Sequence, residues 1–219
     1  MTKTSRLLLL SAFGLLALFV TACVPSLNPF YTAQDVAADP GLPGAWVDAK
    51  GGDNPDSWTF SPAEGPGNPG YTLTVTDNGG KSSGKFKAVL FKLGSERFLD
   101  LEPTQVDLAD TQSGLTKSTL IPGHILARVY QIGPELRFAI TNPDWFGKYL
   151  DAHPDALAHR REHDPDMLYL TATTPELQKF VLAHLGDDEL FAKGSDAADM
   201  VRRPAAPGGA EHSTSNVQH

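Results

Sequence analysis

Cysteine is almost absent from this 219-residue sequence, which contains only Cys23. A single cysteine cannot form a disulfide within the chain, so we expect packing alone to stabilise the fold. Basic residues are also scarce: 18 lysines and arginines stand against 26 acidic residues and form no cluster. An acidic chain without a basic cluster is poorly suited to bind nucleic acid or anionic lipid through charge. We therefore expect no nucleic-acid partner.

Signatures of common catalytic sites are missing as well. No Ser/His/Asp order, paired-carboxylate pattern or cofactor fingerprint stands out. Residues 80–84 match the Gly-x-Ser-x-Gly motif of hydrolases, but they lie in an expected hairpin loop rather than at a strand-to-helix turn. A phosphate-binding loop fails too, because Val75 stands where its first glycine is required. We therefore expect a protein that is not an enzyme and binds no cofactor.

No apolar run is long enough to cross a bilayer comfortably. The longest run, from Leu7 to Ala22, is shorter than the roughly 20 residues that a spanning helix needs, and no basic cluster follows it. Lys3 and Arg6 precede this run, and small residues end it just before Cys23. The order of charged, apolar and small residues is typical of a secretory signal. It favours a cleaved signal peptide over a membrane-spanning anchor.

The end of that segment, Val20-Thr21-Ala22-Cys23, resembles the lipobox of bacterial lipoproteins, in which the signal peptide is cut before the cysteine. The resemblance implies a diacylglyceryl thioether and an amide-linked acyl chain on Cys23. Several chains give lasting attachment, since each buried methylene contributes about 0.8 kcal/mol. Val24 follows where inner-membrane lipoproteins commonly have aspartate, which implies the periplasmic face of the outer membrane. The expected partner is thus the membrane, through the acyl chains on Cys23.

Composition divides the chain into four parts: a signal peptide (1–22), a lipidated tether and lead-in segment (23–43), a β-rich domain (44–193) and a disordered tail (194–219). Cleavage leaves 197 residues and moves the formal charge from −8 to −10, because the signal carries two basic residues and no acid. The lead-in segment is too apolar for a solvated linker, so we expect it to pack across the end of the core. Residues 26–32 and 44–46 also resemble a group of uncharacterised bacterial lipoproteins, which implies no activity.

The middle of the chain carries strand patterns. Apolar residues alternate with threonines from Tyr71 to Thr76, and turn residues follow at 77–80, 94–95 and 133–134. We expect strands at 44–48, 57–61, 71–76, 85–93, 96–101, 123–132, 135–141 and 167–172. Residues 102–121 are a polar excursion without a clear pattern.

Helix signals come late in the chain. Asn142 and Thr174 are suitable caps, each followed by proline and an apolar stripe, and Gly186 ends the second stripe. Pro154 favours a further short helix that carries Leu157. The expected fold is therefore mainly β (α+β): a single antiparallel eight-stranded meander with two or three short C-terminal helices packed on it.

The first expected strand contains Gly44-Ala45-Trp46, which resembles the Gly-x-Trp signature of lipocalins. In that family the tryptophan packs across the closed end of an eight-stranded barrel, which can enclose one small ligand. Alternatively Trp46 is simply a core aromatic, and the sheet is open, strongly curved and covered by the helices. For the barrel, the candidate ligand-binding residues are Trp46, His124, Tyr130 and Trp145.

Three histidines lie close together in sequence: His153, His159 and His163. If residues 159–163 were helical, two imidazoles would share a face, as a metal site requires. Pro165 disfavours a helix there, and the segment is strongly polar, so we expect a solvated connector and no metal.

Two functions remain open at this point. The first is a non-enzymatic, lipid-anchored periplasmic protein that binds a small apolar ligand in a lipocalin-like cavity. The alternative is an envelope interaction or assembly lipoprotein with a filled core, which would instead expose an apolar patch or a free sheet edge to another envelope protein.

Overall fold

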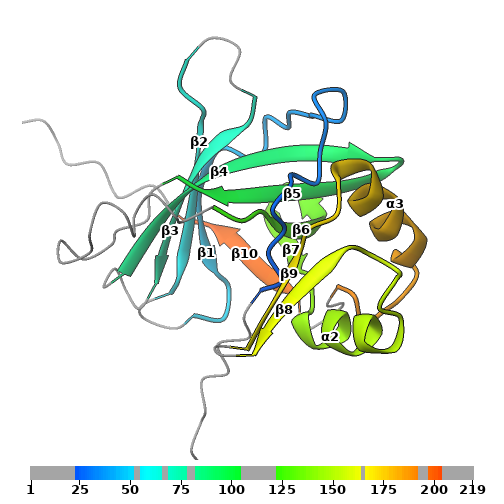
Figure 1. Ribbon diagram of the computed structural model, residues 1–219. Coiled ribbons are helices and arrows are strands. Elements are labelled where there is room, and N and C mark those ends of the chain that lie inside the picture. Colours follow the sequence, from blue (N-terminus) through cyan, green and yellow to red (C-terminus); the bar gives the residue numbers. More distant parts are fainter. Residues whose placement is uncertain are drawn as a thin grey trace, which may run out of the picture.

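Eight antiparallel strands close into a barrel, with the order β1-β10-β7-β6-β5-β4-β3-β2 around the wall (Figure 1). The strands are β1 (Gly44–Asp48), β2 (Ser57–Pro62), β3 (Tyr71–Asp77), β4 (Ser82–Leu93), β5 (Glu96–Pro103), β6 (Ile125–Ile132), β7 (Glu135–Ile140) and β10 (Ala198–Arg202). The computed structural model describes residues 23–51, 55–65, 69–77, 82–104, 122–163, 166–191 and 197–203. The predicted signal peptide, the turn at 78–80, most of the polar excursion and the chain beyond 203 lie outside the described residues.

The closed barrel confirms the predicted eight-stranded antiparallel fold and decides between a barrel and an open sheet. Two parts of the prediction are wrong. The expected last strand at 167–172 is β9 (Asp166–Leu170), which pairs only with β8 (His159–His163) in a separate two-stranded sheet. The strand that closes the barrel is β10, which lies in the stretch predicted to be a disordered tail. It pairs with β1 on one side and β7 on the other, so neighbours distant in sequence supply its stability.

The strands of one wall of the barrel are buried on both faces, so the described residues form two apolar cores. Because side chains alternate between faces, Leu90 points into the barrel and Phe91 points out of it. The inner core comprises Leu42, Trp46, Phe60, Tyr71, Leu73, Ala88, Leu90, Leu99, Leu101, Ala127, Val129, Leu136, Phe138 and Met200. The outer core comprises Val24, Phe30, Phe91, Leu93, Phe98, Leu126, Ala139, Trp145, Phe146, Leu150, Leu157, Leu170, Ala172, Leu177, Phe180, Val181, Leu190, Phe191 and Ala197.

Two short helices cover this wall of the barrel on one side (Figure 1). Helix α2 (Pro143–Ala152) begins after Asn142, the predicted cap. The Asn142 side chain accepts hydrogen bonds from the backbone N–H groups of Asp144 and Trp145. Helix α3 (Thr174–His184) begins one residue earlier than predicted: Thr173 is the cap, and Glu176 accepts from its backbone N–H. Among the described residues, no helix is long and apolar enough to cross a membrane.

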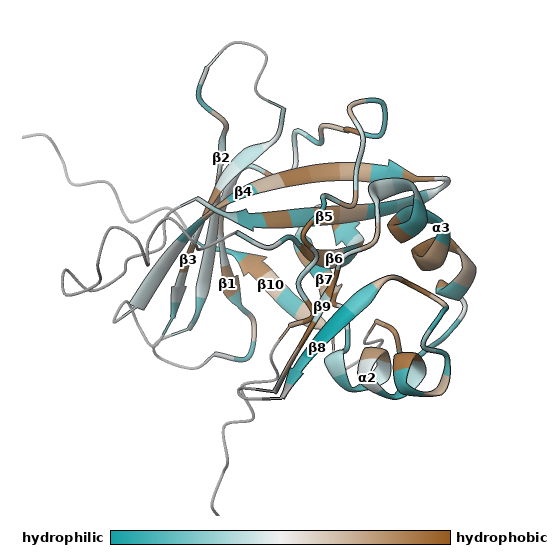
Figure 2. Ribbon diagram, viewed as in Figure 1, coloured by the Kyte–Doolittle hydropathy of each residue, from teal (hydrophilic) through white to brown (hydrophobic). Residues whose placement is uncertain are grey.

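The third helix, predicted after Pro154, is replaced by turns that lead into strand β8. The predicted solvated connector at 159–163 is therefore a strand as well. Figure 2 shows why its sequence was misleading: β8 is hydrophilic along its length, and the apolar residues lie on its partner β9. Pairing with β9, rather than burial of its own side chains, makes it a strand.

The lead-in segment runs along the outer wall from one end of the barrel to the other. Ser26 exchanges two backbone hydrogen bonds with His124, just before β6, and Val36 bridges to Phe91 on β4. The segment then enters the end of the barrel, where Leu42 joins the inner core. The expectation that it packs across the end of the core is met only there, because most of it covers the side of the barrel.

Candidate ligand-binding site

One end of the barrel is closed by Trp46. This side chain is 0% exposed, and its indole Nε1 donates a 2.9 Å hydrogen bond to the carbonyl oxygen of Leu42. The guanidinium of Arg202, on β10, lies 4.3 Å from the centre of the indole ring. Arg202 also donates hydrogen bonds to the carbonyl oxygens of Pro43 and Gly41. The lead-in segment, β1 and β10 are thereby joined in one plug.

Glycine at position 44 suits this plug through its backbone conformation and its lack of a side chain. Its φ is 128°, a conformation that other residues rarely adopt. A Cβ at Gly44 would also lie 2.5 Å from the Nη1 atom of Arg202. The Gly-x-Trp pattern therefore has a physical basis here: the glycine makes room for the arginine that lies on the tryptophan.

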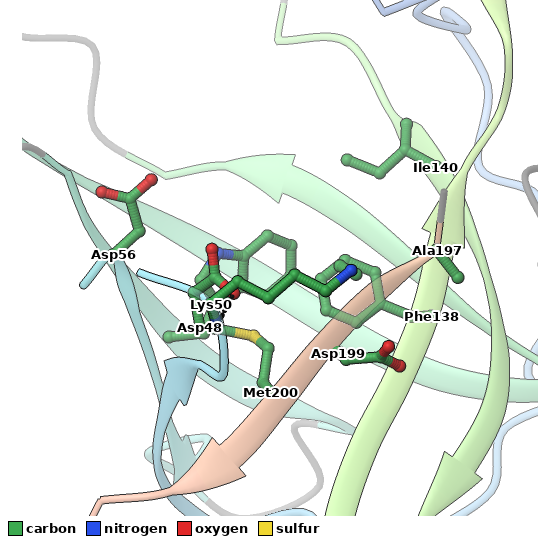
Figure 3. Close-up of a pocket in the computed structure, with 10 residues that line it drawn as sticks. Asp48, Lys50, Asp56, Phe138, Ile140, Ala197, Asp199 and Met200 are labelled. Carbon is green, nitrogen blue, oxygen red and sulfur yellow. Dashed lines mark hydrogen bonds between the residues drawn. The ribbon is translucent and has the colours of Figure 1, made fainter. Parts of the chain in front are cut away.

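The other end of the barrel holds a cavity of about 330 Å³. Its lining residues come from four strands or the turns next to them: Asp48, Lys50, Asp56, Trp58, Phe138, Ile140, Ala197, Ala198, Asp199 and Met200. The register shows why these side chains meet, since Ala198 pairs with Phe138 and Met200 pairs with both Leu136 and Asp48. Figure 3 shows the Phe138 ring and the Met200 side chain within the opening, with Asp56 and Ile140 on opposite sides of it.

The cavity is apolar inside and charged at its rim. The rings of Trp58 and Phe138 are tilted against each other, with centroids 4.5 Å apart. At the rim, Asp199 Oδ1 lies 2.9 Å from the guanidinium Nε of Arg137, and Asp48 accepts a hydrogen bond from the backbone N–H of Lys50. An apolar interior with a few polar groups at the opening is the usual composition of a small-molecule site.

The four predicted ligand-binding residues do not meet in this cavity. Trp46 belongs to the inner core at the opposite, closed end. Trp145 is part of the outer core. Tyr130 packs against this core, and the guanidinium of Arg128 lies 5.3 Å from the centre of the Tyr130 ring. His124 is buried on the outer side of the wall. The cavity is lined instead by Trp58, Phe138, Ile140 and Met200, which the sequence analysis did not single out as site residues.

His124 has a structural partner that explains its burial. Asp100, 1% exposed, accepts from the His124 Nδ1 atom at 2.7 Å with one oxygen and from the backbone N–H of Phe30 at 2.9 Å with the other. Burial acts to lower the pKa of His124, but the hydrogen bond and charge of Asp100 outweigh it, so the pKa is raised above its ordinary value. The pair fastens the lead-in segment to the wall.

A second hollow, of about 620 Å³, lies between the two helices and the turns after α2. Its wall includes Tyr149, Phe180 and His184, whose rings contact one another. Burial lowers the pKa of His184, and His153 acts in the same direction while Asp187 opposes it. Its rings belong to the packing between α2 and α3, and charged residues such as Asp155, Glu176 and Lys179 line much of the rest.

The predicted histidine cluster does not form a metal site among the residues that can be described. His153 Nδ1 and His159 Nδ1 contact the carbonyl oxygens of Tyr149 and Leu157. Within the described ranges, no group of three His, Cys, Asp or Glu side chains could hold a metal ion. The side chain of His163 lies outside the described part.

Cys23, the predicted acylation site, is the first described residue and is half-buried. Burial raises the pKa of its unmodified thiol, which disfavours a reactive thiolate. Comparison of the chain with protein-family models, with curated proteins and with solved structures finds no match. Function has therefore to be inferred from the barrel, its cavity and the N-terminal motif.

Proposed function

We propose that this protein is a non-enzymatic, lipid-anchored periplasmic protein that binds a small apolar ligand in the open end of its lipocalin-like barrel. The observation that carries the proposal is the cavity beside Trp58, Phe138, Ile140 and Met200. Its volume of about 330 Å³ lies at the small end of the roughly 300–1,000 Å³ range of ligand pockets. The expected ligand is correspondingly small and mostly apolar.

The filled part of the barrel sets the size of this ligand. Trp46, Leu42 and Phe60 occupy the interior toward the closed end, and each is at most 1% exposed. A ligand therefore enters only the layer of the barrel at its open end, which is lined by Ala198 and Met200 on β10, Phe138 on the adjacent β7 and Trp58 on β2. Its apolar body would displace water from these walls, and any polar end would remain at the charged rim.

The proposed location follows from the lipobox-like motif before Cys23. Acyl chains on this residue would hold the domain at the periplasmic face of the outer membrane. Replacing Cys23 with serine should release soluble protein or leave an uncut precursor. An unchanged membrane fraction in that variant would contradict the anchor without bearing on the cavity.

Binding can be tested with N-phenyl-1-naphthylamine, an apolar dye whose emission rises in a dry site, titrated into residues 24–219. Ala198→Trp places an indole in the opening, and we expect it to weaken dye binding at least tenfold. Val201→Trp is the matched control, because Val201 lies on the same strand and alternates to the other face of the wall. Equal dye binding by both folded variants would contradict the proposed site.

The alternative function, an envelope interaction protein, is favoured by the extent of filling inside the barrel. It predicted an exposed apolar patch or a free sheet edge. The closed barrel leaves no edge among its eight strands, but Leu27 and Met167 are exposed apolar side chains outside the barrel. Failure of dye binding in the unmodified protein would favour this alternative, and capture of partners from intact envelopes would be the next test.

A further inference from the structure

The lipid anchor would join the folded domain without a flexible tether. Val24, the residue directly after Cys23, is 2% exposed and belongs to the outer core. The carbonyl oxygen of Pro25 accepts a 2.8 Å hydrogen bond from Leu170, and Ser26 is paired with His124. Since consecutive Cα atoms are about 3.8 Å apart, acyl chains on Cys23 would leave the protein within one residue of its packed surface.

The surface around this point has exposed apolar side chains. Leu27 is 40% exposed and Met167, at the start of β9, is 43% exposed; only three large apolar side chains in the described part of the chain are exposed. The backbone N–H of Leu27 donates to the carbonyl oxygen of Leu170 at the end of β9. The lead-in segment therefore lies beside the hairpin formed by β8 and β9. In Figure 1 the described chain begins beside β9.

The cavity opens at the same end of the barrel. Ser26 pairs with His124, which directly precedes β6, and Ile140, which lines the cavity, pairs with Ala127 near that end of β6. Ala197, another lining residue, belongs to the same outer core as Val24. The β4–β5 turn at Gly94 and Ser95 lies at the opposite end, because these strands run from the cavity end to that turn and back.

We propose that this face of the domain, containing Leu27 and the β8–β9 hairpin with Met167, rests on the phospholipid bilayer, and that the cavity opens toward it. The proposal rests on acylation of Cys23, as inferred above. It adds the source of the ligand: an apolar molecule dissolved in the bilayer enters the barrel directly and does not cross bulk water. The closed end, with Trp46 and Arg202, faces away from the membrane.

Depth-dependent quenching tests this orientation. The acylated protein is reconstituted in vesicles of phosphatidylethanolamine and phosphatidylglycerol that contain a lipid with a nitroxide on its head group. Acylation occupies the Cys23 thiol, so a single new cysteine can carry a bimane fluorophore. The positions are Met167→Cys on the hairpin, Lys50→Cys at the cavity rim and Ser95→Cys at the far turn, all exposed in the structure. Circular dichroism checks that each variant is folded.

We expect quenching at positions 167 and 50 to be at least three times that at position 95. Equal quenching at all three positions, or strongest quenching at 95, in protein shown by mass spectrometry to be acylated would overturn the proposed face while leaving the anchor intact. Protein without an acyl mass would overturn both the anchor and the orientation. Strong quenching at position 50, combined with no binding of N-phenyl-1-naphthylamine, would support the orientation and contradict only the ligand cavity.

Discussion

The two ends of the barrel are built from the same strands but are closed in different ways. At one end, Trp46 lies under Arg202 and against Leu42, and three separate segments meet with their polar groups paired. At the other end, aromatic and aliphatic side chains leave about 330 Å³ unfilled between them. Of the two ends, the closed one should therefore contribute more to stability, and the open one should bind the ligand. Substitutions at the two ends test this difference, and substitutions of Asp100 test the attachment of the lead-in segment to the outer wall.

The largest effect is expected from Trp46→Ala. It removes a fully buried indole, its hydrogen bond to Leu42 and the surface on which Arg202 lies, and should cost about 3–5 kcal/mol of unfolding free energy. The matched change at the open end, Trp58→Ala, removes a half-buried indole and should cost about 1–2 kcal/mol. Urea denaturation of both variants measures the difference, and equal losses would contradict the larger contribution of the closed end.

The next largest loss of unfolding free energy is expected from Asp100→Ala. It leaves the Phe30 N–H and the His124 imidazole without their buried acceptor, at a cost of about 2–4 kcal/mol. Glu102→Ala, two residues along the same face of β5, is the control and should change unfolding by no more than about 0.5 kcal/mol. A loss confined to Asp100 would show that the lead-in segment is fastened here, and similar values would indicate a general charge effect.

The same pair predicts a pH dependence. The pKa of folded His124 is raised above the ordinary value of about 6.5, so its protonation stabilises the fold fully below that value. This stability is lost as pH rises through the folded pKa. The urea midpoint should therefore fall above about pH 6.5, and the fall should be weaker in Asp100→Asn. An identical pH profile in both proteins would exclude His124 as its source.

Arg202→Ala should have a smaller effect at the closed end. It removes the contact with the Trp46 ring and hydrogen bonds to the carbonyl oxygens of Gly41 and Pro43, for about 1–2 kcal/mol. Arg203→Ala is the control, because in the described part of the chain Arg203 bonds to the barrel through its backbone N–H, at Ala45. Thermal unfolding of the two variants should separate by several degrees, and coincident curves would contradict the role given to Arg202.

The smallest change is expected from Ile140→Val in the cavity wall. It removes one methylene and should lower unfolding free energy by about 0.5–1 kcal/mol, as half-buried aliphatic positions usually do. Dye affinity should fall about fourfold, because one methylene contributes about 0.8 kcal/mol of apolar contact. Unchanged affinity with reduced stability would place the dye elsewhere.

Seven barrel strands could be predicted from the sequence because each carries a local signal. Alternation from Tyr71 to Thr76 and the glycine turns marked the strand pairs, and the caps at Asn142 and near Thr174 marked both helices. The closing strand β10 could not be found this way. Its five residues include only Met200 and Val201 as bulky apolar side chains, and its partners β1 and β7 are distant in sequence.

The candidate site was harder to predict than the fold. Gly44 and Trp46 pointed to a closed barrel end, but the partner Arg202 lay in the presumed tail. Phe138 and Ile140 lie in β7, where they share the inward face with the core residue Leu136, so the strand pattern did not distinguish cavity from core. His124 was predicted to bind a ligand, whereas its hydrogen bond to Asp100 depends on pairing between β5 and β6.

The central claim is that the open end of the barrel holds a small apolar ligand, and native mass spectrometry tests it most directly. Residues 24–219 and the Ala198→Trp variant would be purified from a bacterial periplasmic fraction and compared under the same conditions. The account predicts a co-purifying small-molecule mass on the unmodified protein that is lost from the variant. A bare protein mass in both, with native circular dichroism, would contradict it.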